Sequence, residues 1–144
     1  MDYSWKIYAL TTVALFLKLL TNSIIQGYYR LKTKSFTMAE DAAFFAKSEP
    51  TKEDNHIAVL VQKIFRNDLE NIPIFLFLLI GYILLNSWAE GTAAYASLFV
   101  FSRIAHTIAY LKQAQPWRHL AYDLGIAVMF ALSGHIVHSV LTSI

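Results

Sequence analysis

Charged and amide side chains recur at helical spacing inside stretches that are otherwise apolar. Between residues 57 and 86, one series stands at i, i+3, i+4 and i+7, and it consists of Lys63, Arg66, Asn67 and Glu70. This spacing places the four side chains on one face of a helix, whereas Asp68 points off that face. Arg binds carboxylates in a bidentate manner, and a carboxylate such as Glu70 accepts a ligand ammonium. The series predicts a binding face for a small zwitterion with more than one carboxylate.

Each of the other apolar stretches carries a polar face as well. The series in the third stretch stands at i, i+3 and i+7 and consists of Arg103, His106 and Tyr110. The fourth stretch begins near Arg118, with Tyr122 one turn later, and the first carries Lys18, Asn22, Gln26 and Tyr29 before Arg30. All of these groups except Lys18 lie toward one end of the predicted helices. We therefore expect one polar site at that end.

Pairing within the protein is the alternative explanation for these groups, because each ionisable side chain at membrane depth costs about 2.5 kcal/mol or more. In that case Arg66 is neutralised by Glu70 or Asp68. Arg103 then pairs with another helix, and Lys18 snorkels or bonds to a backbone carbonyl. Even with Asp68 counted beside Glu70, the acids are outnumbered by the four cations of the series, Lys63, Arg66, Arg103 and Arg118. A bound anion would balance this excess.

The elements that position these groups follow from composition and hydropathy. The 144 residues are 56% hydrophobic and 15% charged, with a mean hydropathy of +0.44, which excludes a disordered chain. About 20 apolar residues cross a hydrocarbon core of about 30 Å. Four stretches meet this length: residues 5–29, 57–86, 92–113 and 117–142. We expect an all-α, integral-membrane four-helix bundle with one domain over residues 1–144 and a kink at Pro73.

The distribution of Lys and Arg predicts the orientation of this multi-pass bundle. The long connection over residues 30–56 carries several cations, and the connection over residues 112–118 carries two, which places both in the cytosol. Both termini then lie on the far side. The first stretch is too long for a signal-peptide core and contains Lys18, so we expect it to stay in the membrane. The host membrane, endoplasmic reticulum or bacterial inner membrane, is left open.

Several classes of function are excluded or disfavoured. The absence of cysteine removes disulfides, zinc thiolate sites and cysteine nucleophiles, and a formal charge of +2 gives no reason to expect nucleic-acid binding. His106 has no second histidine at i+3 or i+4, so we expect no metal. His135 and His138 are expected at the membrane interface. Dinucleotide, P-loop, nucleophile-elbow and zinc-protease motifs are all missing from the sequence.

Two strings make the sequence resemble a known family. RNDLENI over residues 66–72 and RIAHTIAYL over residues 103–111 resemble the MAPEG family, the membrane-associated proteins in eicosanoid and glutathione metabolism. The resemblance extends to Lys18 and Arg30, twelve residues apart, to FTMAEDA over residues 36–42, and to Arg118 and Tyr122 after a proline. It covers essentially the whole chain. The second string is most similar to the microsomal glutathione S-transferase branch.

The resemblance implies a homotrimer of four-helix protomers that binds glutathione in a bent form between adjacent subunits, near the cytosolic side. Glutathione carries two carboxylates and one ammonium, which is the ligand class that the charge pattern favours. Together with Arg103 from the third polar series, the predicted glutathione-binding residues are Arg30, Lys63, Arg66, Asn67, Glu70, His106, Tyr110, Arg118 and Tyr122. Val59 and Leu60 depart from the family, because they stand where many relatives have a Glu-Arg pair.

The implied activity is glutathione transfer. Arg118 and a hydroxyl from Tyr122 or Tyr110 are the predicted catalytic groups, which stabilise the glutathione thiolate. The thiolate would attack a hydrophobic electrophile or a lipid hydroperoxide that arrives from the membrane lipid. One alternative is a non-catalytic membrane protein that binds lipids or partners. A second, prostaglandin E synthase-like isomerisation, is disfavoured because His119 replaces a serine of that enzyme, although Asp41 matches its loop aspartate. An ion-conducting subunit is disfavoured because the charges cluster at one depth.

Overall fold

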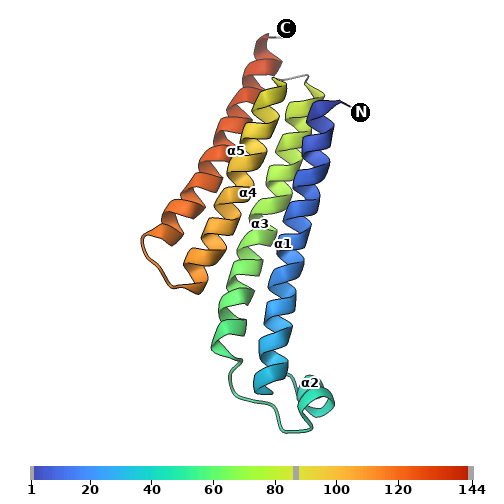
Figure 1. The fold of residues 1–144 in the computed structure, drawn as a ribbon, viewed down its shortest axis with the longest axis vertical. Coiled ribbons are helices and arrows are strands. Elements are labelled where there is room, and N and C mark those ends of the chain that lie inside the picture. Colours follow the sequence, from blue (N-terminus) through green and yellow to red (C-terminus); the bar gives the residue numbers. More distant parts are fainter. Residues whose placement is uncertain (1, 86–87, 143–144) are drawn as a thin grey trace.

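The computed structural model describes residues 2–85 and 88–142, and the regular structure within them is entirely helical. Four long helices and two short helical segments follow one another along the chain (Figure 1). They are α1 (Tyr3–Thr33), α2 (Ala39–Asp41), the π-helical turn η1 (Ala42–Ala46), α3 (His56–Leu84), α4 (Ala89–Leu111) and α5 (Trp117–Thr142). The all-α prediction is confirmed for the described residues.

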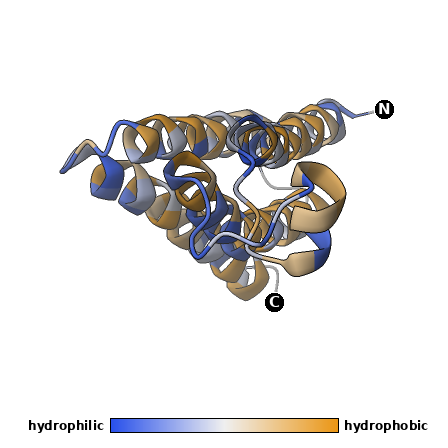
Figure 2. Ribbon diagram, turned by 90° about the horizontal axis from the view of Figure 1, so that it is seen from below, coloured by the Kyte–Doolittle hydropathy of each residue, from blue (hydrophilic) through white to orange (hydrophobic). Residues whose placement is uncertain are grey.

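The long helices run side by side as a bundle (Figure 1). α1 packs mainly on α3, and α4 packs mainly on α5, while contacts of α4 with α1 and α3 join the two pairs. Both ends of the chain lie at one end of the bundle, and the α1–α3 and α4–α5 connections lie at the other (Figure 1). Viewed from the latter end, the helices are mostly hydrophobic and the connections are largely hydrophilic (Figure 2).

Membrane crossing is supported for three of the helices by their length and composition. α1, α3 and α5 are each long and apolar enough to span a bilayer, and α4 is not among the helices that meet both criteria. The fourth predicted span therefore stays a prediction. Large apolar side chains also face outward, with Phe77 and Phe130 each 75% exposed on this single chain. Such a surface suits lipid or a neighbouring subunit better than water.

The connection between α1 and α3 is shorter than the predicted loop over residues 30–56, and that boundary was wrong. α1 continues to Thr33, with Arg30 and Lys32 in its last turn, where cations interact favourably with the helix dipole. Lys34 then ends the helix in the left-handed conformation with φ of 52°. Residues 39–46 add a short helical segment. Polar side chains do not end a helix, so charge alone marked the end of α1 too early.

α3 begins at His56, one residue before its predicted start, and a side chain caps this end of the helix. Asn55 Oδ1 accepts hydrogen bonds from the backbone N–H groups of Ile57 and Ala58, at 2.9 and 3.4 Å. α3 ends at Leu84, and its predicted end at residue 86 lies outside the described residues. The helix continues through Pro73, and the kink expected there stays a prediction. α4 begins at Ala89 and ends at Leu111, earlier at both ends than the predicted 92–113.

The apolar core lies between the four long helices, toward the end that holds the termini. Its centre is a stacked aromatic pair, Phe75 of α3 and Phe99 of α4, whose ring centroids are 3.8 Å apart. Leu15 of α1, Leu79 of α3 and Leu132 of α5 are almost completely buried in the same cluster. This packing fixes the rotation of each helix about its own axis. The polar series of α3 and α4 are thereby turned toward each other at the opposite end of the bundle.

Candidate functional site

An open cavity of about 280 Å³ lies between α3 and α4, near the end that holds the α1–α3 and α4–α5 connections. We call it the candidate pocket, and its lining residues are Lys63, Arg66, Asn67, Glu70, His106 and Tyr110. All six belong to the predicted glutathione-binding set. α3 contributes its whole polar series, and α4 contributes the histidine and the tyrosine one turn apart.

The α3 wall of the candidate pocket is charged and open to solvent. Arg66 Nε donates to Glu70 Oε1 at 3.3 Å across one helical turn, and the two side chains are 84% and 60% exposed. Lys63 is also exposed. Side chains this accessible keep hydrogen-bonding capacity that a ligand can take up.

The α4 wall is aromatic and more deeply buried. His106 is only 4% exposed, and its ring lies edge-on to Tyr110 at 5.5 Å and tilted toward Tyr122 at 6.3 Å between centroids. Its Nδ1 is buried and has no hydrogen-bond partner among the described residues. The guanidinium of Arg118 stacks over the ring of Tyr110 at 4.7 Å. This contact links Arg118, at the start of α5, to the pocket wall.

Arg103 is not part of the pocket lining, although it belongs to the same polar series as His106 and Tyr110. Its side chain is completely buried. Its Nη1 donates to Asn67 Oδ1 at 3.1 Å, and its Nη2 donates to the backbone carbonyl of Tyr122 at 3.5 Å. The guanidinium therefore lies behind the pocket wall, where it connects α3, α4 and α5.

Lys18 pairs with an acid on the neighbouring helix, and the expectation that it snorkels or bonds to a backbone carbonyl is wrong. Its ammonium forms an ion pair with Asp68, which also accepts a hydrogen bond from Asn22 Nδ2 at 3.0 Å. Asp68 is fully buried and is therefore unavailable to Arg66. The signal in the sequence was the off-face position of Asp68, together with Lys18 and Asn22 one turn apart in the first apolar stretch.

Arg30 is also engaged inside the chain and lies outside the candidate pocket. Its Nε donates to Asp54 Oδ2 at 2.6 Å, and the two side chains form an ion pair. Asp54 Oδ1 accepts a second hydrogen bond from the backbone N–H of Asn55, at 3.0 Å. This arrangement ties the end of α1 to the start of α3. A role for Arg30 in binding glutathione remains a prediction.

The excess of positive charge at the site persists after these pairings. Arg103 and Lys18 are held within the protein, so neither contributes to the exposed surface. In the pocket lining, Lys63 and Arg66 still stand against the single acid Glu70. Arg118 adds a third cation beside Tyr110. An anionic ligand in this pocket would gain charge-assisted hydrogen bonds, which are roughly twice as strong as neutral ones.

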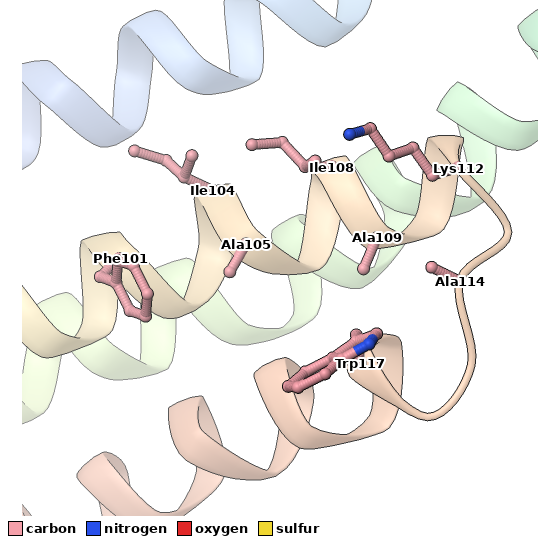
Figure 3. A pocket seen from close by; sticks show the side chains of 8 residues that line it. All are labelled: Phe101, Ile104, Ala105, Ile108, Ala109, Lys112, Ala114 and Trp117. Atoms are coloured by element: carbon pink, nitrogen blue, oxygen red, sulfur yellow. The ribbon is translucent and has the colours of Figure 1, made fainter.

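An apolar cavity of about 340 Å³ lies along α4, beside the α4–α5 connection and the first residue of α5 (Figure 3). We call it the apolar slot, and it is lined by Phe101, Ile104, Ala105, Ile108, Ala109, Lys112, Ala114 and Trp117. Ala109 directly precedes Tyr110, and Trp117 directly precedes Arg118. Sequence reasoning did not find this slot, because its shape depends on how α5 packs against α4. Within residues 2–85 and 88–142, no group of three or more His, Cys, Asp or Glu side chains could hold a metal ion.

Comparison with known proteins finds one family profile and several named relatives that match most of this chain. The profile of the MAPEG family matches residues 8–138. Microsomal glutathione S-transferase 1 of Sus scrofa is 36% identical over 126 residues, which are 85% of this chain and 81% of that protein. The Homo sapiens protein of the same name is 34% identical over the same shares of both chains. Prostaglandin E synthase of Equus caballus is 32% identical over 118 residues, which are 81% of this chain and 76% of that protein.

The match to the MAPEG profile extends over nearly the whole bundle and includes every residue of the candidate pocket. It agrees with the resemblance carried by residues 66–72 and 103–111. The all-helical fold with helices long enough to cross a membrane fits the same assignment. The chain therefore belongs to the MAPEG family.

Proposed function

We propose that this protein is a membrane-bound glutathione transferase, which activates the glutathione thiolate for reaction with hydrophobic electrophiles or lipid hydroperoxides. The candidate pocket is the observation that carries the proposal. It brings two exposed cations, one carboxylate and one amide together with the aromatic wall of α4, in which His106 is buried. Glutathione has two carboxylates for the cations and one ammonium for the acid. The relatives named glutathione S-transferase support the same ligand.

The proposed chemistry depends on ionising the thiol. A free thiol has a pKa of about 8.5, so only a few per cent is ionised near neutral pH. Arg118, with a hydroxyl from Tyr110 or Tyr122, would stabilise the thiolate through charge-assisted contacts. The guanidinium already lies against the ring of Tyr110. In conjugation, the sulfur forms a bond to an electrophilic carbon, and the leaving group departs with its electron pair.

Hydroperoxide reduction uses the same thiolate. The sulfur attacks the outer oxygen of the hydroperoxide, and the released alkoxide takes up a proton to become an alcohol. A second glutathione converts the resulting sulfenic acid into glutathione disulfide and water. The apolar slot offers a place for the hydrophobic partner of either reaction, because it opens at the same end of the bundle as the candidate pocket.

The proposal includes an assembly and an orientation. A homotrimer would cover part of the apolar surface that a single chain exposes, and it would place Arg30 at a subunit boundary. The candidate pocket would face the cytosol, because the connections near it carry most of the Lys and Arg outside the helices. Native mass spectrometry of the detergent-solubilised protein tests the assembly, and a monomer at all concentrations would contradict it.

Calorimetric titration is the most direct test of the ligand. Glutathione and its S-hexyl analogue are titrated separately into the detergent-solubilised protein. We expect both to bind, and the analogue to bind more tightly because its alkyl chain is buried in an apolar site. Turnover of an aryl halide with glutathione then tests catalysis. Binding without turnover above the uncatalysed rate would favour a non-catalytic binding protein instead.

Prostaglandin E synthase activity is the second candidate, because three of the relatives carry that name at 32% identity. His119, which stands in place of a serine of that enzyme, is exposed, and its Nε2 lies 3.4 Å from the side-chain amide of Gln115. We expect no isomerisation of a prostaglandin endoperoxide above the uncatalysed rate. Product analysis by mass spectrometry distinguishes the two activities.

A further inference from the structure

Arg103 is the largest of the fully buried side chains in the described structure, and it carries a charge. Its three hydrogen-bond acceptors are neutral: Ser102 Oγ at 3.4 Å, Asn67 Oδ1 at 3.1 Å and the carbonyl of Tyr122 at 3.5 Å. The buried carboxylate of Asp68 interacts electrostatically with the guanidinium without accepting a hydrogen bond from it, and burial of the charge still costs free energy.

The acceptors of Arg103 belong to elements that form the site. Asn67 lines the candidate pocket from α3, and Tyr122 lies on α5 with its ring near His106. The guanidinium also lies over the ring of Tyr122 at 5.8 Å. A guanidinium reaches these groups at once because its five N–H donors are held in a rigid planar fork. A lysine ammonium at the same position would be a single, shorter point of contact.

Gly125 on α5 provides the space for this guanidinium. A Cβ atom added at Gly125 would clash with Nη2 of Arg103 and would lie 2.9 Å from Ser102 Oγ and 3.1 Å from Arg103 Cζ. Arg103 is fully buried, so its guanidinium would have to displace packed neighbours in order to move. Gly134 on the same helix has no atom within 4 Å of such a Cβ. Of these two glycines of α5, only Gly125 lies against Arg103.

We infer that Arg103 is a positioning residue for the glutathione site: it fixes the amide of Asn67 and the ring of Tyr122 without contacting the ligand. Donation from Arg103 to Oδ1 occupies the acceptor side of the Asn67 amide. The Nδ2 donors are then directed away from Arg103 and toward the pocket, where a carboxylate of the ligand can accept them. This inference rests on the proposed function, since it concerns how the same pocket binds glutathione.

A double-mutant cycle tests the connection between Arg103 and Asn67. The dissociation constant of glutathione is measured by calorimetry for the wild type, Asn67→Ala, Arg103→Lys and the double variant. Loss of a hydrogen bond to a charged group corresponds to a change of about tenfold or more, so we expect Asn67→Ala to weaken binding by that factor in the wild-type background. In the Arg103→Lys background, the same change should cost less than about threefold, because the amide is no longer held.

A second pair of variants tests the space at Gly125. Gly125→Ala should displace the guanidinium and weaken glutathione binding severalfold, whereas Gly134→Ala should leave binding unchanged. Both changes add one methyl group to α5 and raise helix propensity equally. Thermal unfolding followed by circular dichroism shows which variants are folded. If Arg103→Lys does not fold, the two glycine variants decide the question.

Each outcome bears on the inference. If the factors by which Asn67→Ala and Arg103→Lys weaken glutathione binding simply multiply in the double variant, the two residues are not coupled. That result would overturn the inference, because it is what a purely structural role of Arg103 predicts. Equal affinities of Gly125→Ala and the wild type would overturn it as well. A wild type that does not bind glutathione would reject the proposed function, and the inference with it. A wild type that binds glutathione without coupling would reject the inference alone.

Discussion

Arg66 and Glu70 form an ion pair in which both side chains are exposed to solvent. Pairs of this kind, one turn apart on a helix, contribute only about 0.3–0.5 kcal/mol to stability. The pair is therefore of little use to the fold. The pair lines the candidate pocket, where Arg66 could bind a carboxylate of the ligand and Glu70 could bind its ammonium group.

Replacing Arg66 should separate binding from folding. We expect Arg66→Ala to leave the melting temperature nearly unchanged and to weaken glutathione binding about tenfold or more, the effect of losing a charge-assisted contact. Calorimetry and thermal unfolding measure the two quantities. Lys52→Ala is the matched control, because Lys52 is an exposed cation in the α1–α3 connection, outside the pocket. Equal weakening in both variants would indicate a general effect of charge.

Arg118 is expected to act on the thiol rather than on affinity. In Arg118→Ala, the thiolate fraction of bound glutathione should fall about tenfold, which corresponds to losing about 1.4 kcal/mol of thiolate stabilisation. The dissociation constant should change less. The ultraviolet absorbance of the thiolate in the complex measures this fraction. Tyr110→Phe and Tyr122→Phe identify the hydroxyl donor, and an unchanged thiolate signal in Arg118→Ala rejects its catalytic role.

Helices α1 and α3 are joined at depth by the ion pair of Lys18 and Asp68. Both side chains are nearly or fully buried, and Asn22 adds a hydrogen bond to the carboxylate. Removing one partner leaves the other charge buried and unpaired, which typically costs about 3–5 kcal/mol. The pair thus matters to the contact between two elements, and the candidate pocket depends on how α3 is held.

Asp68→Asn should therefore lower the stability of the bundle by several kcal/mol, on the order of the cost of an unpaired buried charge. The double variant Lys18→Met with Asp68→Leu should recover most of the loss, since neither charge remains. Thermal unfolding in detergent measures both. A double variant that is less stable than Asp68→Asn would show that the pair has a role that apolar packing cannot replace.

The junction of α3 and α4 is another close contact between elements. A Cβ atom at Gly91 would clash with the hydroxyl of Tyr82 and lie 2.8 Å from Trp88 Cε3. Tyr82 is almost fully buried and donates to the Trp88 carbonyl at 3.2 Å, so its ring has little room to move. Gly91→Ala should destabilise the protein by about 1–3 kcal/mol through overpacking. Gly27→Ala, at an open position, should not destabilise it.

The termini lie at one end of the molecule, and the α1–α3 and α4–α5 connections lie at the other (Figure 1). The residues that line the candidate pocket lie toward the end with the connections. If the bundle crosses a membrane, residues 34–55 and the start of α4 lie on opposite sides. The absence of cysteine makes this arrangement testable with single-cysteine variants. Glu49 and Glu90 are exposed at the two ends, and Phe130 is exposed on the apolar surface.

A membrane-impermeant thiol reagent should label Glu49→Cys and Glu90→Cys from opposite sides of sealed vesicles. We expect Glu49→Cys to react from the cytosolic side. Phe130→Cys should resist the reagent from both sides, because lipid or a neighbouring subunit covers it. Labelling of Glu49→Cys and Glu90→Cys from the same side would show that α3 does not cross the membrane, which would contradict the proposed orientation.

The face of α3 that forms half of the candidate pocket could be predicted from the sequence alone. Residues at i, i+3, i+4 and i+7 share a face in any helix, so Lys63, Arg66, Asn67 and Glu70 lie together whatever surrounds them. The same local geometry placed His106 and Tyr110 on one face of α4. The family resemblance was likewise readable from two short strings, and the comparisons confirm it.

The partners of the buried charges were decided only by the tertiary structure. Lys18 and Asp68 are 50 residues apart, Arg103 and Asn67 are 36 apart, and Arg30 and Asp54 are 24 apart. Helical periodicity relates residues within one helix, but it does not fix how each helix is rotated against the next. That rotation follows from core packing around Phe75 and Phe99. It places Arg103, which the sequence predicted to face the site, in a buried position behind the pocket wall.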